Sequence, residues 1–344
     1  MNIDVPLQFM PLAHGTNPLT AVAPEMILGM HCLGLCTAAN THTPPTQQVS
    51  LPILGQAADA LHEIWHVADA CQAGQFESIA FRRTDAVLFG TISIDEASLH
   101  VAEGASSLLA AAESAYRQIF ALLAAEGFPH LWRTWNYLPA IHAEECGLER
   151  YRQFNIGRHQ AFGAFERPVD SSPAACALGV DNGPLSIAFI AGRSPSTRIE
   201  NPRQVSAFAY PSQYGPRSPT FTRAATVANG DGEILFISGT ASIVGHETQH
   251  HGDVAAQTRE TVANLAALLE QANLKRAAQH YTLQDLIYRV YIRHASDYAQ
   301  VRDTLESLVG NDIQVLYVQA EVCRRDLLVE IEAVAFKPLK GMLS

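Results

Sequence analysis

The sequence predicts an α+β protein made of two similar halves, each a mixed β-sheet with helices packed on one face. Apolar runs rich in β-branched residues are repeatedly followed by long stretches with apolar residues at helical spacing. The pattern Gly-Thr-x-Ser-Ile occurs at residues 90–94 and again at 239–243, and the order of predicted elements after it is the same both times. We therefore infer an internal duplication, and this order of strands and helices is typical of an α+β fold.

The first half begins with a strand predicted over 85–94. A long helix is predicted over 98–126, because apolar residues recur there at helical spacing and Gly127 follows as a stop signal. A strand over 131–138 and a second helix over 149–161 come next.

The second half repeats this order and adds two strands at its end. Asp253 is a suitable N-cap for its long helix. In order, its elements are expected at 233–243, 253–272, 286–292, 298–309, 313–322 and 327–336.

The segment between the halves is rich in proline, glycine, serine and arginine, and short strands are expected at 186–191 and 205–210. Loops of this composition commonly carry binding groups. We place the domain boundary after them. Residues 1–218 then form an N-terminal half with an extra N-terminal segment, and residues 219–344 form a C-terminal domain.

Composition narrows the class of protein. The 344 residues are 48% apolar and 17% charged, which excludes a disordered chain, and the formal net charge is −11. Such an acidic chain disfavours nucleic acid or an anionic membrane as the main partner. The start lacks a basic segment, and no apolar run approaches the roughly 18 residues of a membrane helix, so we expect a cytoplasmic protein.

The six cysteines form no CxxC pair. In a chain of this length we expect them to be reduced, Cys32 and Cys36 included, rather than to form a disulfide framework.

One sequence pattern matches the HExxH motif of zinc proteases, at His246-Glu-Thr-Gln-His250. That chemistry needs both histidines on one face of a helix. Gly245 and Gly252 flank the motif, which lies just before the expected N-cap Asp253. We therefore expect a polar loop and no metal site.

The last predicted strand carries two glutamates in an apolar setting. Glu330 and Glu332 share one face by the period-two alternation of a strand, opposite Val329 and Ile331. If that face were open to water, both would be ordinary solvated carboxylates. If it lines a pocket, a partly desolvated carboxyl group has a raised pKa and can act as a general acid. Cys323, taken alone, fits a core cysteine better than a nucleophile.

Arginines gather in the middle of this acidic chain, where bidentate contacts could capture a carboxylate or a phosphate. Arg217 lies between two prolines in the segment 214–221, which restricts its backbone, and a binding role is favoured for it and for Arg158. Ordinary solvated side chains are the better interpretation for Arg193, Arg198 and Arg203.

Part of the second half resembles the YjgF/RidA family. Residues 328–335 are similar to that family's C-terminal signature, and 236–240 and 252–258 to its first strand and the start of its first helix. The resemblance covers residues 220–336. The arginine that RidA enamine deaminases carry fifteen residues before the first glutamate falls on Val315, which disfavours RidA-type deamination.

A larger part of the chain resembles the chorismatases, FkbO-like enzymes that convert chorismate on a RidA-like, chorismate-mutase-like architecture. The matching stretches are 150–158, 210–219, 238–247 and the terminal strand. The resemblance implies a pocket between two RidA-like halves, with Glu330 as the acid. Cys323 matches the cysteine of the hydroxybenzoate-forming members. The implied substrate contacts are Tyr151, Arg158, Gln213, Tyr214, Arg217, Arg223, Gly239, Thr240 and Ala241.

The expected reaction is acid-catalysed cleavage of the enolpyruvyl ether of chorismate, giving pyruvate and 3-hydroxybenzoate, 4-hydroxybenzoate or both, without a cofactor. Three alternatives remain open: a chorismate hydrolase that forms a dihydroxycyclohexadiene carboxylate, a RidA-type imine or enamine hydrolase, and a non-catalytic binder of carboxylates. RidA proteins are trimers, and two copies in one chain favour a monomer here.

Overall fold

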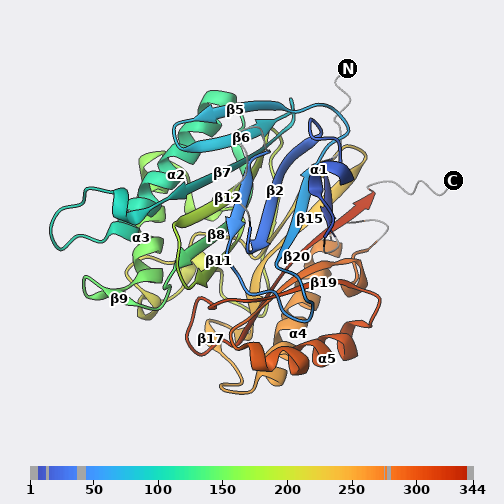
Figure 1. The fold of residues 1–344 in the computed structure, drawn as a ribbon. Coiled ribbons are helices and arrows are strands. Elements are labelled where there is room, and N and C mark those ends of the chain that lie inside the picture. Colours follow the sequence, from blue (N-terminus) through green and yellow to red (C-terminus); the bar gives the residue numbers. More distant parts are fainter. Residues whose placement is uncertain (1–6, 13–14, 37–43, 275, 277–279, 339–344) are drawn as a thin grey trace.

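The computed structural model describes residues 7–12, 15–36, 44–274, 276 and 280–338. Three β-sheets surround a shared interior, and helices cover the outer faces of two of them (Figure 1). The interior contains one large apolar cluster, to which all three sheets contribute.

The sheet of the first half has six strands in the order β11-β8-β12-β7-β6-β5. The helices α2 (Ser107–Glu126) and α3 (Arg150–Ala164) pack together and cover its outer face. Its strands are β5 (Gln72–Phe76), β6 (Ile79–Arg83), β7 (Val87–Ile94), β8 (His130–Pro139), β11 (Ala174–Val180) and β12 (Leu185–Gly192).

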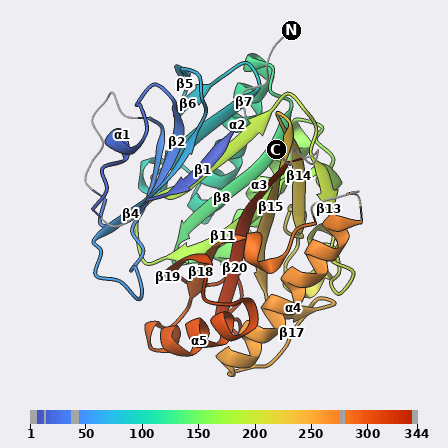
Figure 2. The same cartoon turned by 90° about the vertical axis from the view of Figure 1, so that its right-hand side faces the viewer.

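The sheet of the second half has the order β13-β14-β15-β20-β18-β19. The helices α4 (Val254–Asn273) and α5 (Tyr298–Val309) lie together outside it, as Figure 2 shows. Its strands are β13 (Thr197–Ile199), β14 (Ala224–Asn229), β15 (Gly232–Ala241), β18 (Ile287–Ile292), β19 (Gln314–Gln319) and β20 (Val329–Pro338).

The two sheets match strand for strand. In each, the strand that is last in sequence inserts at the centre, as β12 and β20 do, and one pair is parallel, β8 with β11 and β18 with β19. The predicted α+β fold with two similar halves is confirmed.

The N-terminal segment forms a third sheet in the order β1-β4-β2-β3, and a short helix α1 (Pro18–Ala21) follows β1. Its strands are β1 (Gln8–Pro11), β2 (Ile27–Gly34), β3 (Thr46–Val49) and β4 (Ala60–His66). This sheet closes the side of the interior that the two matched sheets leave uncovered (Figures 1 and 2).

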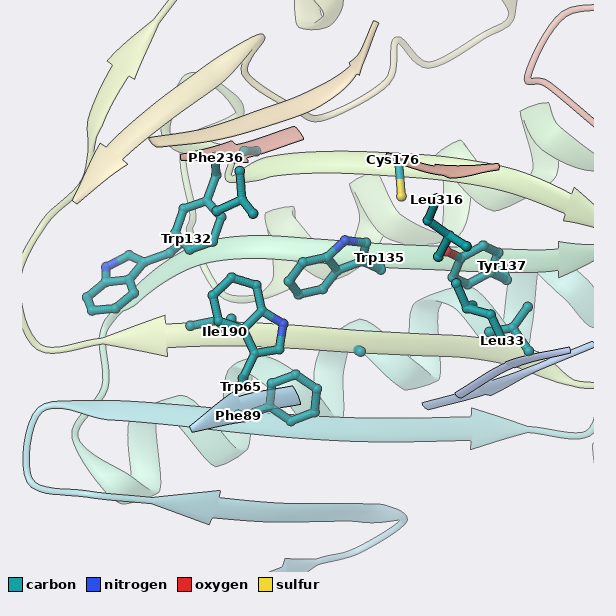
Figure 3. Close-up of a cluster of buried hydrophobic side chains, with 14 of the residues drawn as sticks. Leu33, Trp65, Phe89, Trp132, Trp135, Tyr137, Cys176, Ile190, Phe236 and Leu316 are labelled. Atoms are coloured by element: carbon teal, nitrogen blue, oxygen red, sulfur yellow. The ribbon is translucent and has the colours of Figure 1, made fainter. Parts of the chain in front are cut away.

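Aromatic side chains from the three sheets meet in the interior. Trp65 of β4 lies against Trp135 of β8 and Phe236 of β15, with ring centroids 5.9 and 5.8 Å apart. Figure 3 shows this cluster together with Phe89 and Tyr137. Burial of large apolar side chains is the main stabilising contribution in such a core.

Two of the predicted elements are wrong in detail. The helix expected from Ser98 begins at Ser107, because Gly104 has a positive φ of 77° and the Ser106 hydroxyl accepts a hydrogen bond from the Leu109 amide as N-cap. The strand expected at 205–210 contains a 3₁₀ turn at Ala207–Ala209.

The expectation that all six cysteines are reduced is also wrong. Cys32 and Cys36 form a disulfide, with their Cα atoms 6.1 Å apart. Gly34, with a φ of 104°, turns the chain between them, and a turn of this kind cannot be recognised from the spacing of the cysteines alone. Within the described residues no helix is long and apolar enough to cross a membrane.

Short hairpins complete the structure. β9 (Glu144–Glu145) pairs with β10 (Leu148–Glu149), and β16 (Ile243–Val244) pairs with β17 (Glu247–Thr248). The HExxH pattern lies in the second hairpin and not on a helix, as its glycine flanks indicate.

Candidate active site

A cavity of about 390 Å³ lies where the two matched halves meet. The first half contributes residues of β10 and α3, and the segment between the halves contributes Tyr210 and Tyr214. The second half contributes Gly239, Cys323 and Glu330. Because residues from three regions of the chain line it, the cavity depends on how the two sheets are joined.

The strand β11 makes this junction. The Ala175 amide donates a hydrogen bond of 2.8 Å to the Ser238 hydroxyl, and Gly179 and Glu321 exchange backbone hydrogen bonds of 2.7 and 3.1 Å. Cys176, between these two points, therefore lies beside Gly239 and the terminal strand.

Glu330 points from β20 into this junction and is only 4% exposed. Its neighbours Val329 and Ile331 point the other way, into the core beneath α4 and α5, as the alternation predicts. The facing strand β15 has an irregular register between Ile237 and Thr240, where Gly239 lies. A Cβ atom at residue 239 would overlap the Glu330 carboxylate, so glycine makes room for it.

Burial, together with the negative charge of Glu332, raises the pKa of Glu330 to about 8. Arg133, Cys323 and Arg223 act in the opposite direction without overcoming this. Glu330 is therefore mostly protonated at neutral pH and can donate a proton. The Cys323 thiol lies 3.9 Å from Oε2 of Glu330, and burial raises the pKa of the thiol to about 12.

Glu332, two residues along the same face, has different surroundings. It forms ion pairs with Arg133 of β8 and with Arg289 of β18, the latter at 2.7 Å, and it accepts a hydrogen bond of 3.0 Å from the Tyr291 hydroxyl. The two buried carboxyl groups thus differ in their partners. Such a difference allows one carboxyl group to act as an acid while its neighbour serves as a carboxylate.

Four arginines line the cavity, Arg152, Arg223, Arg324 and Arg325, and two of them have an unpartnered donor. Arg223 donates to the Val205 carbonyl and to the Tyr210 hydroxyl, both at 2.7 Å, while Arg324 stacks over the Tyr214 ring at 4.0 Å. Nε of Arg223 and Nη2 of Arg324 are buried and have no hydrogen-bond partner among the described residues. Both residues line the cavity, and each therefore has one donor that no described protein group satisfies.

Seven of the residues singled out from the sequence line this cavity. They are Tyr151, Tyr214, Arg223, Gly239, Ala241, Cys323 and Glu330.

The other four predicted contacts do not line it. Gln213 and Arg217 are exposed. Arg158 is buried within α3 and stacks over the Phe154 ring, and the Thr240 hydroxyl donates to the Ser238 carbonyl. For Arg217 the two prolines restrict the backbone, as expected, but they leave the side chain at the surface.

Several cavity residues were not predicted. Arg324, Arg325 and Glu149 all line the cavity, and Cys176 lies behind Gly239. The adjacent arginines beside Cys323 were a usable signal in so acidic a chain. Cys176 gave none, because its position depends on the contact between the two sheets.

The β16–β17 hairpin supports one wall of the cavity. The Tyr214 hydroxyl donates to the His246 carbonyl at 2.6 Å, and Nη1 of Arg324 donates to the same carbonyl at 2.8 Å. The other histidine of the pattern, His250, lies 3.6 Å from Glu260. The two histidines thus interact with different partners.

Comparison with known proteins places this geometry in a family. A family model described as "Chorismatase FkbO/Hyg5-like, N-terminal" matches residues 63–191. A chorismatase of Streptomyces rapamycinicus is 37% identical over 283 residues, which cover 80% of this chain and 82% of that protein. The chain belongs to the chorismatase family.

Further similarities extend over nearly the whole length. A 3-hydroxybenzoate synthase of Streptomyces hygroscopicus is 32% identical over 321 residues, covering 89% of this chain and 92% of that protein. The crystal structure of a chorismatase superposes with a TM-score of 0.86 at 31% identity, over 97% of this chain and all of the other. A model described as "Endoribonuclease L-PSP" matches residues 220–337, the stretch that resembles YjgF/RidA.

Proposed function

We propose that this chorismatase cleaves chorismate to pyruvate and 3-hydroxybenzoate, 4-hydroxybenzoate or both. The single observation that carries the proposal is Glu330, a buried carboxylic acid with a pKa of about 8, at the wall of a cavity with two unpartnered arginine nitrogens. The names of the relatives, chorismatase and 3-hydroxybenzoate synthase, support the same substrate.

Glu330 has the properties of the required acid. The enol ether of chorismate breaks after protonation of its terminal methylene carbon, because this generates an oxocarbenium ion. A carboxyl group that is neutral at working pH can donate that proton, and its conjugate base then stabilises the cation. A positioned general acid contributes on the order of 10²–10⁴ in rate.

The arginines match the charges of the substrate. Chorismate has one carboxylate on the ring and one on the enolpyruvyl group, so two separate cationic contacts are needed. We assign these to Arg223 and Arg324, which line the cavity and each have a donor without a partner. Arg223 lies just before β14 and Arg324 in the loop before β20. Tyr151 and Tyr214 would complete the walls around the ring.

The assignment of the product rests on Cys323, which lines the cavity beside the acid. The atoms of chorismate equal those of hydroxybenzoate plus pyruvate, so this reaction consumes no water and needs no oxidant. A chorismate hydrolase would instead add one water and leave a non-aromatic diol.

The test is incubation of the purified protein with chorismate, with pyruvate measured enzymatically and the aromatic products by chromatography. We expect equal amounts of pyruvate and hydroxybenzoate. Glu330→Gln should abolish turnover and leave the fold and substrate binding intact. No pyruvate from the wild-type protein would overturn the proposal, and pyruvate with a non-aromatic diol would identify a hydrolase.

We also propose that the protein is a cytoplasmic monomer whose domain boundary follows residue 218. The N-terminal sheet supports the monomer, because it covers the side of the interior where a further copy would otherwise pack. Light scattering after gel filtration should give a mass of 37.3 kDa, and a trimer would contradict this.

A further inference from the structure

We propose that Glu332 is a positioning residue for the acid: it forms ion pairs with Arg133 and Arg289, and its negative charge beside Glu330 holds Glu330 in the protonated form. This deepens the proposed function and rests on the assignment of Glu330 as the acid. Glu332 does not line the cavity, so it would act through Glu330 and not on the substrate.

The two carboxyl groups are close and equally shielded from solvent. Glu330 and Glu332 point to the same side of β20, about 7 Å apart along the strand, and each is 4% exposed. Water screens little at such sites, so a negative charge on one residue opposes a second negative charge on the other.

The partners of Glu332 show which of the two carries the charge. Arg133 pairs with its Oε2, Arg289 pairs with its Oε1, and Tyr291 donates to Oε1. A buried carboxylate is stable when ion pairs and hydrogen bonds satisfy its oxygens, as they do here. No lysine or arginine of the described chain forms an ion pair with Glu330.

The charges around Glu332 already balance. Arg289 also pairs with Glu63 of β4, in the N-terminal sheet, so two guanidinium groups face two carboxylates. Arg133 is held further by donating to the Ile237 carbonyl at 3.2 Å. An ionised Glu330 would add a third, unpaired negative charge to this set.

The other groups that face Glu330 do not offset this effect. Arg223 lowers the pKa of Glu330 only slightly, and it is bonded to Val205 and Tyr210. Arg324 and Arg325, which also line the cavity, are bonded to the carbonyls of His246 and His142. Four uncharged groups also face Glu330, one each from the loop before β20, β11, α3 and β18. Burial is the main cause that raises their pKa values. These are Cys323, Cys176, Tyr151 and Tyr291.

This arrangement serves proton donation. The charge of Glu332 makes Glu330 a weaker acid, but it keeps the proton on Glu330 near neutral pH, so the donor is protonated when the substrate binds. When the proton leaves, a carboxylate forms beside the charge of Glu332. The new carboxylate then gains a cationic partner in the oxocarbenium ion, so the repulsion is offset only while that ion exists.

The test is an infrared titration of the protein without substrate. In the wild type, the carbonyl band of a buried protonated carboxyl should disappear with a midpoint near 8, and Glu330→Gln should remove this band. In Glu332→Gln the midpoint should fall by about one pH unit or more, a roughly ten-fold or greater rise in the acid dissociation constant. Glu332→Asp, which keeps the charge, should stay near the wild type. An unchanged midpoint in Glu332→Gln would overturn the proposal.

Turnover provides an independent measurement. The pH above which kcat for chorismate declines should move down in Glu332→Gln together with the infrared midpoint, and KM should change less. If the wild-type protein does not turn over chorismate, the proposed function fails, yet the infrared titration still decides the role of Glu332.

If Glu332→Gln does not fold, neutron diffraction of the wild-type protein near neutral pH replaces it. A deuteron on Glu330 and none on Glu332 is the expected result. A deuteron on Glu332, or on neither carboxyl group, would contradict the proposal.

Discussion

At the scale of single residues, the position of the Glu330 carboxyl group depends on the absence of a side chain at Gly239. The bulge in β15 brings this glycine directly against the carboxyl oxygens, with Cys176 behind it. In a regular strand a larger residue would fit at position 239, but here the Glu330 carboxyl group occupies the space that a side chain would need.

Gly239→Ala is therefore expected to displace the acid. A Cβ atom overlaps Oε1 of Glu330, so the carboxyl group must rotate away, and kcat should fall by roughly 10²-fold with a smaller change in KM. Steady-state kinetics with chorismate measures this. Gly163→Ala on α3, where nothing lies within 4 Å, is the matched control and should keep full activity. Equal activity of both variants would contradict this account of the site.

The protonation of Glu330 also predicts how stability depends on pH. At pH values between the ordinary pKa of glutamate and about 8, Glu330 of the folded chain holds a proton that the unfolded chain has released. Stability contributed by this group is thus fully present below that window and is lost as pH rises through about 8. Turnover should decline over the same range.

Urea denaturation at about pH 6 and about pH 9 measures this effect. Between about pH 6 and about pH 9, the free energy of unfolding of the wild type should fall by on the order of 2–3 kcal/mol more than that of Glu330→Gln. A variant that loses as much as the wild type would show that another group causes the change.

At the scale of elements, one buried side chain contacts the loop between β19 and β20 at several points. Arg293, at the end of β18, donates to the carbonyls of Leu327 at 2.8 Å, Arg324 at 2.6 Å and Val322 at 3.2 Å. It also pairs with Glu321. The loop carries Cys323 and Arg324, so its shape determines two residues of the cavity wall.

Arg293→Met should remove the donors that Arg293 supplies to these carbonyls and destabilise the protein by about 3 kcal/mol. Arg293→Lys should recover part of this loss, and kcat should fall in both. The matched control is Arg302→Met on α5, whose guanidinium pairs with the exposed Asp303, so this variant should keep nearly the stability of the wild type. Thermal denaturation compares the three variants, and equal effects at both positions would refute the role of Arg293.

Elements with a regular pattern could be predicted from the sequence. The strand of Glu330 and Glu332 and the helix capped by Asp253 were predicted within two residues, because alternation and capping are local properties. The segment 205–210 was not, since Val205 bonds to Gly245 and Arg223 rather than to a sheet.

For the site too, only the features that depend on local sequence could be predicted. Glu330 was predicted because it lies on that regular strand, whereas Cys323 was assigned to the site only through the resemblance to the chorismatases. The partners of Glu332 could not be predicted, because Arg133 and Arg289 reach it from two other strands, one of them in the other half. Conversely, the local sequence of Arg217 and Arg158 indicated binding, but the fold places neither at the cavity wall.

At the scale of the whole molecule, the three sheets share one interior. Trp65 reaches from the N-terminal sheet to aromatic residues of both matched sheets, and Glu63 on the same strand pairs with Arg289. The N-terminal segment, whose role the sequence did not reveal, is therefore part of the core and supports the charged network near the acid.

Trp65→Ala should destabilise all three sheets together. Truncation of a buried tryptophan costs about 3–5 kcal/mol, and because the cluster is shared we expect one cooperative transition at a lower urea concentration. Circular dichroism and tryptophan fluorescence should report the same midpoint. Separate transitions would show that the N-terminal sheet unfolds on its own.

The strand-for-strand match of the two sheets has a consequence for stoichiometry. The central strand β12 corresponds to β20, and on its interior face, where β20 carries Glu330 and Glu332, β12 carries Ser186, Ala188 and Ile190. None of these three side chains carries a carboxyl group, and Ser186 accepts a hydrogen bond from Gln47 of β3. The first half therefore has no carboxylic acid at this place and supports the site of the second half. An inhibitor that mimics the transition state should saturate at one molecule per polypeptide.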